Sequence, residues 1–475
     1  MFLKYRNILA LVLLMFGFST CVEQTRSASV WNDGRFEAPL RDLDGIIREG
    51  KLRVVVDYNY TNYFVYRGKP MGFKYEMLKR LSNDLGVKLE FVVSNDLEET
   101  FRGLETGRFD LAAKNLTVTS ERSSRVDFSR PIMQTRQVLV QRRPRSGDPE
   151  GDLFVNNQLE LGGKTVTVQK NSAFVARLHH IQEEIGEKLR VVEDSVAGVE
   201  QLVSMVASGE IDYTVCDEHT ARLYSRHYHN LDVSVPVSFR QNIAWAVRKD
   251  AHRLKEYVDG WLAEFQETAD YKQLQVKYFS ADRHMTRVRN SYHSMVNGRI
   301  SPYDEIIRRE AGAGKWDWRL IASIIYQESQ FDTTASSWAG ASGLMQLMPE
   351  TARSFGVENT ADPLQNIRGG IRLLSWLDSQ FKSEIRDQDE RLKFVLAAYN
   401  VGLGHVKDAQ RLAQKYGKDP NRWNNNVDYF ILNKSRASYY TDPVVKWGYA
   451  RGAEPYEFVA SVLSNYGHYK NVIPE

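Results

Sequence analysis

The chain has 475 residues, more than one hydrophobic core usually supports, so we expect about two to four domains. Its 63 Lys and Arg residues nearly balance its 60 Asp and Glu residues, which leaves a formal net charge of +3. Nucleic-acid-binding proteins usually have a pronounced basic excess, so this charge argues against nucleic acid as a partner. The 2 cysteines, Cys21 and Cys216, are too few for a disulfide framework.

Residues 1–20 have the pattern of an export signal. Two basic residues and an apolar run over residues 8–18 precede two small residues and then Cys21. The run is too short to span a membrane stably, so we expect a signal peptide. No later segment of the sequence is apolar for long enough to cross a bilayer, so we expect any membrane attachment at Cys21.

The residues that end at Cys21 resemble the lipobox of bacterial lipoproteins, which implies a lipid anchor on this cysteine. An ordinary cleaved signal followed by an incidental thiol is the alternative. Val22 comes next, where an inner-membrane retention signal would usually have Asp. We therefore expect the periplasmic face of the outer membrane as the location. Residues 21–45 are polar without a sustained apolar period, and they are predicted to be a tether.

Predicted strands and helices alternate from residue 46 onward. Residues 52–56 and 89–93 have the composition of strands, and residues 75–85 have apolar positions at helical spacing. Strands that alternate with helices favour an α/β fold with a parallel, doubly wound sheet.

An internal repeat indicates two similar lobes. Residues 104–115 and 206–217 each contain the end of a predicted helix, a glycine suited to a left-handed cap, and a strand that ends in a polar residue. Ligands of open α/β sheets bind beyond the carboxyl ends of strands. Asn115 and Asp217 are therefore expected on facing rims of a cleft.

Residues 46–282 resemble the bacterial extracellular solute-binding proteins of the amino-acid-binding family, which have a two-lobed, periplasmic-binding-protein-like fold. The segments that carry the resemblance are residues 50–54, 72–78, 116–122 and 126–129. The resemblance implies that Arg122 grips a ligand carboxylate, that Thr119 helps it, and that Asp217 meets the ligand amino group. A guanidinium group pairs with a carboxylate through two parallel hydrogen bonds, which suits the first role. A surface ion pair of Arg122 with a neighbouring acid is the alternative.

The ligand is expected to be small and amino-acid-like, or a peptide of the cell wall. The entry to the second lobe, residues 170–173, lacks the glycine-rich turn of many transport members of the family. This difference leaves room for a ligand larger than a free amino acid.

The last third of the chain has a different pattern. Residues 283–300 are charged and weakly periodic, as expected of a linker. Residues 301–475 show helical periodicity throughout with few β-branched runs, so they are predicted to form a separate all-α domain.

Glu328 is an acid on the apolar stripe of one of these predicted helices. Asp317 is suited to cap that helix, and Ile321, Ile325 and Glu328 follow at helical spacing on one face. Desolvation there would raise the pKa of the carboxyl group, so that it can donate a proton as a general acid near neutral pH. A hydrogen-bonded structural acid near a helix end is the alternative.

Two further motifs follow Glu328 in the sequence. Residues 336–349 include two glycines that allow a close approach of the backbone, and Gln346 there offers both a donor and an acceptor. Later, Tyr399 and Asn400 close another predicted helix and place a phenol and an amide at its end.

These motifs, in this order, resemble the lysozyme-like domain of lytic transglycosylases of the soluble type. The resemblance implies that Glu328 is the sole catalytic acid and base. The other residues implied in the site are Ser337 and Tyr399, which assist catalysis, and Met345, Gln346, Asn400 and Tyr456, which contact the saccharide. Simple core packing is the alternative for Met345, Gln346 and Tyr399, and a turn cap is the alternative for Ser337.

The resemblance implies cleavage of peptidoglycan glycan strands without water. Most glycosidases use two carboxylates, whereas the nearest second acid here, Asp332, has the sequence context of a turn. As the resemblance implies, Glu328 protonates the oxygen between N-acetylmuramic acid and N-acetylglucosamine, and the muramic C6 hydroxyl then closes a 1,6-anhydro ring. No metal and no cofactor are needed.

Two other functions remain open at this point. The domain could be a lysozyme-type muramidase that uses Glu328 with water. The chain could instead be a solute-binding protein that an inactive helical domain tethers to the wall.

Overall fold

The computed structural model describes residues 41–59, 61–144, 153–279 and 298–473. The predicted signal peptide, Cys21 and most of the expected linker lie outside these residues. Helix α2 (Leu43–Glu49) begins inside the segment predicted as a tether, because Asp42 caps it by accepting a hydrogen bond from the Leu43 N–H group. None of the helices in the described part of the chain has the length and hydropathy of a membrane span.

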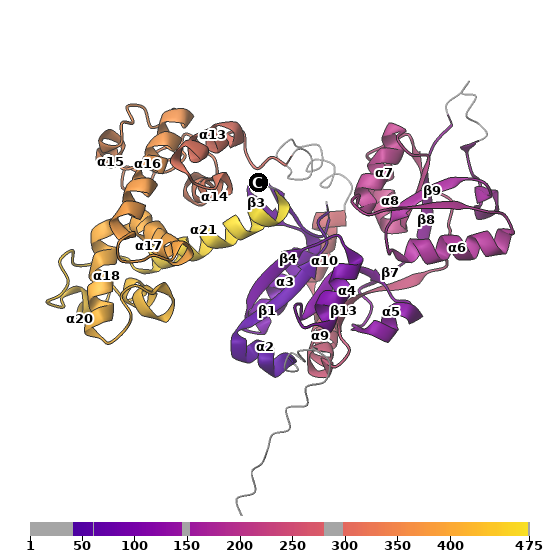
Figure 1. The fold of residues 1–475 in the computed structure, drawn as a ribbon, viewed down its shortest axis with the longest axis horizontal. Coiled ribbons are helices and arrows are strands. Elements are labelled where there is room, and N and C mark those ends of the chain that lie inside the picture. The colour runs from indigo at the N-terminus through magenta and orange to yellow at the C-terminus, as the bar shows by residue number, and fades with distance from the viewer. Residues whose placement is uncertain (1–40, 60, 145–152, 280–297, 474–475) are drawn as a thin grey trace, which may run out of the picture. The chain divides into compact units, whose positions relative to one another are not determined.

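The first lobe is built on a six-stranded sheet (Figure 1). In spatial order its strands are β4 (Lys88–Val93), β1 (Lys51–Val56), β5 (Leu111–Thr117), β13 (Gln241–Arg248) and β6 (Val126–Phe128), and β7 (Met133–Thr135) also pairs with β13. Strand β1 is parallel to β4 and β5, whereas β13 is antiparallel because it brings the chain back from the second lobe. The sheet is thus mixed rather than wholly parallel.

Helices cover both faces of this sheet. Val54 and Val56 of β1 belong to a core that includes α3 (Phe73–Asp84), while Val55 belongs to a separate core with α4 (Leu97–Glu105). This alternation is the period-two pattern of a strand that is buried on both sides. The remaining elements of the lobe are the hairpin of β2 (Phe64–Tyr66) and β3 (Lys69–Met71), α5 (Ser120–Arg125), α9 (His252–Phe265) and α10 (Ala269–Phe279).

The second lobe has a five-stranded sheet of the same kind. Its strands, in spatial order, are β10 (Arg190–Asp194), β9 (Thr165–Gln169), β11 (Tyr213–Asp217), β8 (Gln137–Arg142) and β12 (Leu231–Asp232). Its helices are α6 (Ala173–Ile185), α7 (Val199–Ser208) and α8 (Glu218–Ser225). The α/β two-lobed architecture predicted from the sequence is therefore confirmed.

The internal repeat is also confirmed in the structure. Helix α4 leads through Gly107 into β5, and α7 leads through Gly209 into β11. Both glycines have left-handed backbone angles, with φ of 71° and 90°, which other residues adopt at a cost. Asp217 ends β11 as predicted, whereas β5 continues to Thr117, so that Asn115 lies inside its strand.

The C-terminal domain is all-α, as expected (Figure 1). Its helices are α13 (Asp304–Gly314), α14 (Trp318–Ser329), α15 (Pro349–Ser354), α16 (Pro363–Phe381), α17 (Gln388–Val401), α18 (Leu403–Lys415), α19 (Asp428–Leu432), α20 (Ala437–Tyr440) and α21 (Ala453–Val472). Helix α14 packs against α13 and α21, and α17 packs against α16 and α21. The ends of α14 and α17 are brought together by their shared partner α21.

Candidate functional site

Glu328 lies in the last turn of α14. The helix begins at the cap residue Asp317, which accepts a hydrogen bond from the Arg319 N–H group, and Ile321 and Ile325 are fully buried in the domain core. Burial of its carboxyl group is the single cause that shifts the pKa of Glu328, and it raises this pKa to about 8. Near neutral pH the group therefore keeps its proton, which is the state that a general acid needs.

The turn that follows α14 is bonded to the helix that carries Glu328. The Ser329 hydroxyl donates a hydrogen bond to the Leu344 carbonyl oxygen at 2.8 Å. Gly343 in this turn has a φ of 82°, and a Cβ atom there would overlap the carbonyl oxygen of Thr360 and the side chain of Asn366. A residue without a side chain is required at this close approach.

Gln346 holds the same turn together from inside. Its Nε2 atom donates to the carbonyl oxygens of Ala335 and Gly343, both at 2.9 Å. Its φ of 46° is uncommon for a residue other than glycine, so the surrounding bonds must hold it in place. The amide nitrogen of Gln346 thus donates its hydrogen bonds within the turn, and a saccharide would contact the amide oxygen.

Ser337 and Met345 occupy the turn in different ways. The Ser337 hydroxyl accepts a hydrogen bond from the Ala341 N–H group at 3.0 Å, which is a turn-capping contact, and it can still donate its own proton. The Met345 side chain is fully buried, and a Cβ atom at Gly370 would overlap its sulfur. Its packing in the core leaves the Met345 side chain no exposed surface to offer a saccharide.

Tyr399 joins the end of α17 to the turn and to Glu328. Its hydroxyl donates to the Met345 carbonyl oxygen at 2.6 Å, and its ring stacks on Phe458 of α21, with centroids 6.3 Å apart. Burial, and then the negative charge of Glu328, raise the pKa of Tyr399 well above its ordinary value. The phenol therefore stays protonated beside the acid.

Asn400 and Tyr456, which are also predicted for the site, lie near the ends of two helices. Asn400 follows Tyr399 and is exposed, and Tyr456 is half-buried in the first turn of α21. Asp332 is exposed and accepts hydrogen bonds from the N–H group and the hydroxyl of Thr334, which lower its pKa. This is the turn role that its sequence context predicts.

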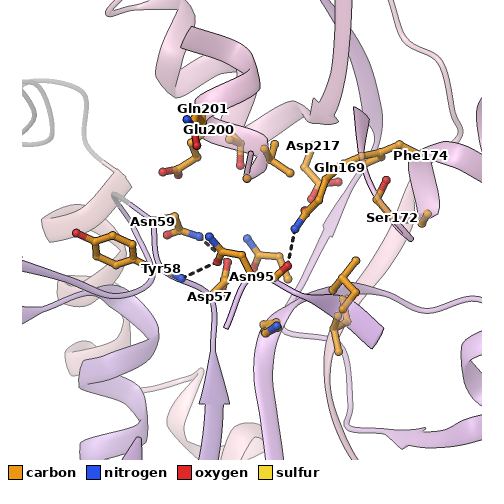
Figure 2. A pocket seen from close by; sticks show the side chains of 18 of the residues that line it. Asp57, Tyr58, Asn59, Asn95, Gln169, Ser172, Phe174, Glu200, Gln201 and Asp217 are labelled. Atoms are coloured by element: carbon orange, nitrogen blue, oxygen red, sulfur yellow. Dashed lines mark hydrogen bonds between the residues drawn. The ribbon is translucent and has the colours of Figure 1, made fainter. Parts of the chain in front are cut away.

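A second site lies between the two lobes, where a pocket of about 450 Å³ opens (Figure 2). Its size is in the usual range for small-molecule sites. The charged and polar residues that line it include Asp57, Asn95, Lys114, Asn115, Arg122, Gln169, Ser172 and Asp217. The sequence prediction that Asn115 and Asp217 face one cleft is therefore confirmed.

Arg122 is buried at this pocket. Its guanidinium group donates to the carbonyl oxygens of Thr117 at 3.2 Å and Asn171 at 3.3 Å, and burial lowers its pKa to about 10. Arg122 forms no ion pair with any residue that the structure describes, so the surface-ion-pair alternative is not observed. Thr119 caps α5 by accepting a hydrogen bond from the Arg122 N–H group at 3.2 Å, and it thus orients the helix that carries the arginine.

Asp217 ends strand β11 on the opposite side of the pocket. Its Oδ1 atom is buried and has no hydrogen-bond partner among the described residues. Burial raises its pKa to about 7, while the positive charges of Lys74 and Arg122 act in the opposite direction. A buried acceptor without a partner is costly, so this carboxylate is poised to receive a donor from a ligand.

Hydrogen bonds also join the two lobes across the pocket. The Gln169 Nε2 atom donates to the Asn95 carbonyl oxygen at 2.7 Å (Figure 2), and Arg122 donates across to Asn171. The two lobes are therefore in direct contact around the pocket.

Three charged residues of the first lobe were missed by the sequence reasoning. Lys74 and Lys114 are buried, and burial lowers the pKa of each to about 8, while Asp57 acts on both in the opposite direction. Lys114 was detectable as a charge inside an apolar strand, next to the predicted Asn115. Lys74 gave no such signal, because a helix often carries a lysine on its solvent face.

Comparisons with known proteins cover both halves of the chain. Residues 52–281 match the model of bacterial extracellular solute-binding proteins, family 3, and residues 305–422 match the model of the transglycosylase SLT domain. A mutant of ArgBP from T. maritima is 27% identical, with a TM-score of 0.44, over 50% of this chain and 99% of that chain. An ancestral arginine-binding protein is 25% identical, with a TM-score of 0.42, over 49% and 99%.

Proteins named membrane-bound lytic murein transglycosylase F are similar over nearly the whole chain. The protein from Desulfosudis oleivorans is 34% identical over 432 residues, which cover 91% of this chain and 92% of that protein. The protein from Stutzerimonas stutzeri is 33% identical over 432 residues, which cover 90% and 86%. The similarity thus includes both domains in the same order.

Proposed function

Because this chain belongs to the family of membrane-bound lytic murein transglycosylase F, we propose that Glu328 is the acid and the base of its sugar-cleaving site. The chain is a peptidoglycan lytic transglycosylase with a solute-binding-protein-like N-terminal domain. The observation that carries the proposal is the half-buried carboxyl group of Glu328 at the end of α14, whose pKa desolvation raises to about 8.

In the first step, protonated Glu328 donates to the glycosidic oxygen between N-acetylmuramic acid and N-acetylglucosamine. The bond from the muramic C1 atom to this oxygen breaks, and the muramic N-acetyl group assists at C1. In the second step, the Glu328 carboxylate takes the proton of the muramic C6 hydroxyl, and the C6 oxygen bonds to C1. The acid is thereby restored, and the product ends in a 1,6-anhydro ring.

The neighbours of Glu328 support a single-carboxylate reaction. Tyr399 is a protonated phenol beside the acid, and Asp332 is engaged with Thr334 in its own turn. Ser337, Gln346, Asn400 and Tyr456 are proposed to orient the reacting sugars around these groups.

Mass spectrometry of digested peptidoglycan tests the chemistry. We expect 1,6-anhydro ends, each lighter by one water than a reducing end. Reducing ends would instead show a lysozyme-type hydrolase that uses Glu328 with water. If the wild type releases no more product than the Glu328→Gln variant, the helical domain is inactive.

The pocket between the lobes is proposed to bind a small ligand with a carboxylate and an ammonium group, either amino-acid-like or a wall peptide. Arg122 would pair with the carboxylate, and Asp217, whose buried oxygen has no partner among the described residues, would accept from the ammonium group. A thermal-shift screen of the full chain against amino acids and wall peptides tests this role. A stabilising ligand whose effect persists in Arg122→Ala would overturn the assignment.

Membrane association is the function proposed for the N-terminal segment. The relatives are named membrane-bound, and we propose a lipid on Cys21 and the periplasmic face of the outer membrane as the location. Detergent-phase partitioning of the full chain and of Cys21→Ser tests the anchor. Equal partitioning of the two proteins would exclude it.

A further inference from the structure

A buried acid fixes the loop that precedes α21, residues 441–452. Asp408 of α18 is fully buried, and it accepts hydrogen bonds from the N–H groups of Lys446 at 2.8 Å and Trp447 at 2.9 Å. Lys434 at 2.9 Å and Arg411 also donate to its carboxylate. Such charge-assisted bonds are the strong ones, so this loop has a defined conformation.

The loop presents Trp447 beside the end of α17. A Cβ atom at Gly404 would overlap the Cδ2, Cε2 and Nε1 atoms of the Trp447 indole together, so the ring lies face-on over this glycine. Gly404 belongs to the first turn of α18, only a few residues after Tyr399 and Asn400. The indole is nevertheless 64% exposed, which leaves its other face open.

The same loop reaches a second indole on the turn after α14. The guanidinium carbon of Arg451 lies 5.6 Å from the ring centroid of Trp338, within the range of a cation–π interaction. Trp338 follows Ser337 directly, in the turn that Ser329 bonds to α14. It is 89% exposed despite this contact.

Two exposed indoles therefore lie on the loop before α21 and on the turn after α14, and the contact of Arg451 with Trp338 links these two segments. Exposed aromatic rings of this size are unfavourable in water, and they are characteristic of recognition surfaces. The C–H faces of pyranose rings pack well on aromatic faces, and the adjoining site cleaves a chain of pyranose rings.

We propose that Trp338 and Trp447 are stacking platforms that hold sugar rings of the glycan strand that the Glu328 site cleaves. Arg451 is a positioning residue that orients the Trp338 ring. The inference rests on the transglycosylase function of the Glu328 site, and it adds substrate-positioning residues that touch no reacting atom.

Kinetics of the full chain on peptidoglycan test the platforms. We expect Trp338→Ala and Trp447→Ala each to raise KM about tenfold, as loss of a well-packed aromatic contact does, with kcat and its pH profile retained. Trp338→Phe should keep most of the affinity, and Arg451→Ala should raise KM less than Trp338→Ala. The matched control is Trp376→Ala, because Trp376 is 44% exposed but packs on Phe355 at a ring distance of 6.2 Å.

A binding measurement separates this inference from the catalytic proposal. Co-sedimentation of the Glu328→Gln chain with insoluble peptidoglycan requires no turnover, and we expect Trp338→Ala or Trp447→Ala in that background to weaken it. If both tryptophan variants have the KM of the wild type and co-sediment as the unsubstituted chain does, the stacking role of the two indoles is wrong. A lower kcat with unchanged KM would also overturn this role, because it would assign the indoles to another step.

Discussion

Glu328 in the helical domain is half-buried and Asp217 in the two-lobed domain is buried, and desolvation raises their pKa values to about 8 and about 7. Their neighbours differ. Lys74 and Arg122 favour the charged form of Asp217, whereas no cation of the described residues shifts the pKa of Glu328, which lies beside the phenol of Tyr399. Asp217 can therefore ionise to receive an ammonium group, and Glu328 retains a proton to donate.

The comparison shows that burial alone does not determine what an acid does. The same desolvation produces a binding group where cations of the first lobe act on the acid, as at Asp217, and a proton donor where desolvation is the only cause of the shift, as at Glu328. The two sites can accordingly be separated by substitutions and by pH.

The largest expected effect is the loss of cleavage in Glu328→Gln. The amide cannot donate an acidic proton, so we expect peptidoglycan cleavage to fall by about 10²–10⁴-fold, while ligand binding between the lobes is unchanged. Release of soluble muropeptides measures the first property, and a thermal shift with ligand measures the second. Asp332→Asn is the matched control, because this carboxylate is exposed and pairs only with its own turn.

Arg122→Ala is expected to weaken ligand binding between the lobes and to leave peptidoglycan cleavage unchanged. Removal of the guanidinium group leaves a ligand carboxylate unpaired in a buried pocket, so affinity should fall by about 100-fold, whereas the anhydro chemistry of the helical domain is retained. Arg125→Ala on the same helix is the control, because Arg125 pairs with Glu98 and Glu105 instead of facing the pocket. Equal affinity losses in the two variants would indicate damage to α5 and not loss of a ligand contact.

Activity and ligand binding should depend on pH in opposite directions. Glu328 must be protonated to act first as an acid, so kcat/KM for peptidoglycan should fall about tenfold per pH unit above its pKa of about 8. A rate that stays constant from pH 7 to about pH 10 would contradict the role of this acid.

Ligand affinity should instead weaken as the pH falls below about 7, because Asp217 then gains a proton. Lys74, Lys114 and Arg122 remain charged in that range, since their pKa values lie at about 8, 8 and 10. Isothermal titration at several pH values measures the effect, and a ligand analogue without the amino group should not show it.

Much of both sites was predictable from local sequence patterns. The apolar stripe that carries Glu328 and the glycine-capped repeat that ends in Asn115 and Asp217 depend on spacing within one or two elements. Lys74 and the loop that carries Trp447 were not predictable, because their surroundings come from segments distant in the sequence. Met345 shows the same limit, since the packing of Gly370 decides that its side chain is buried.

The last expected effect is on stability, and its pH dependence tests the same comparison without any substrate. The carboxyl group of Glu328 has an ordinary pKa of 4.5 when exposed and about 8 when folded, so the folded chain binds more protons than the unfolded chain between these values. The free energy of unfolding contributed by this group therefore falls as pH rises from about 4.5 to about 8, and it is constant outside that window. Glu328→Gln removes this dependence.

The melting temperature of Glu328→Gln relative to the wild type should consequently increase with pH through this window. The substituted amide changes the melting temperature by the same amount at every pH. The informative quantity is therefore how the difference in melting temperature changes with pH, and not whether this difference is positive or negative at one pH. A flat difference would mean that water reaches the carboxyl group in the folded chain. In that case Glu328 would be an ordinary ionised acid at neutral pH, and its contrast with Asp217 would disappear.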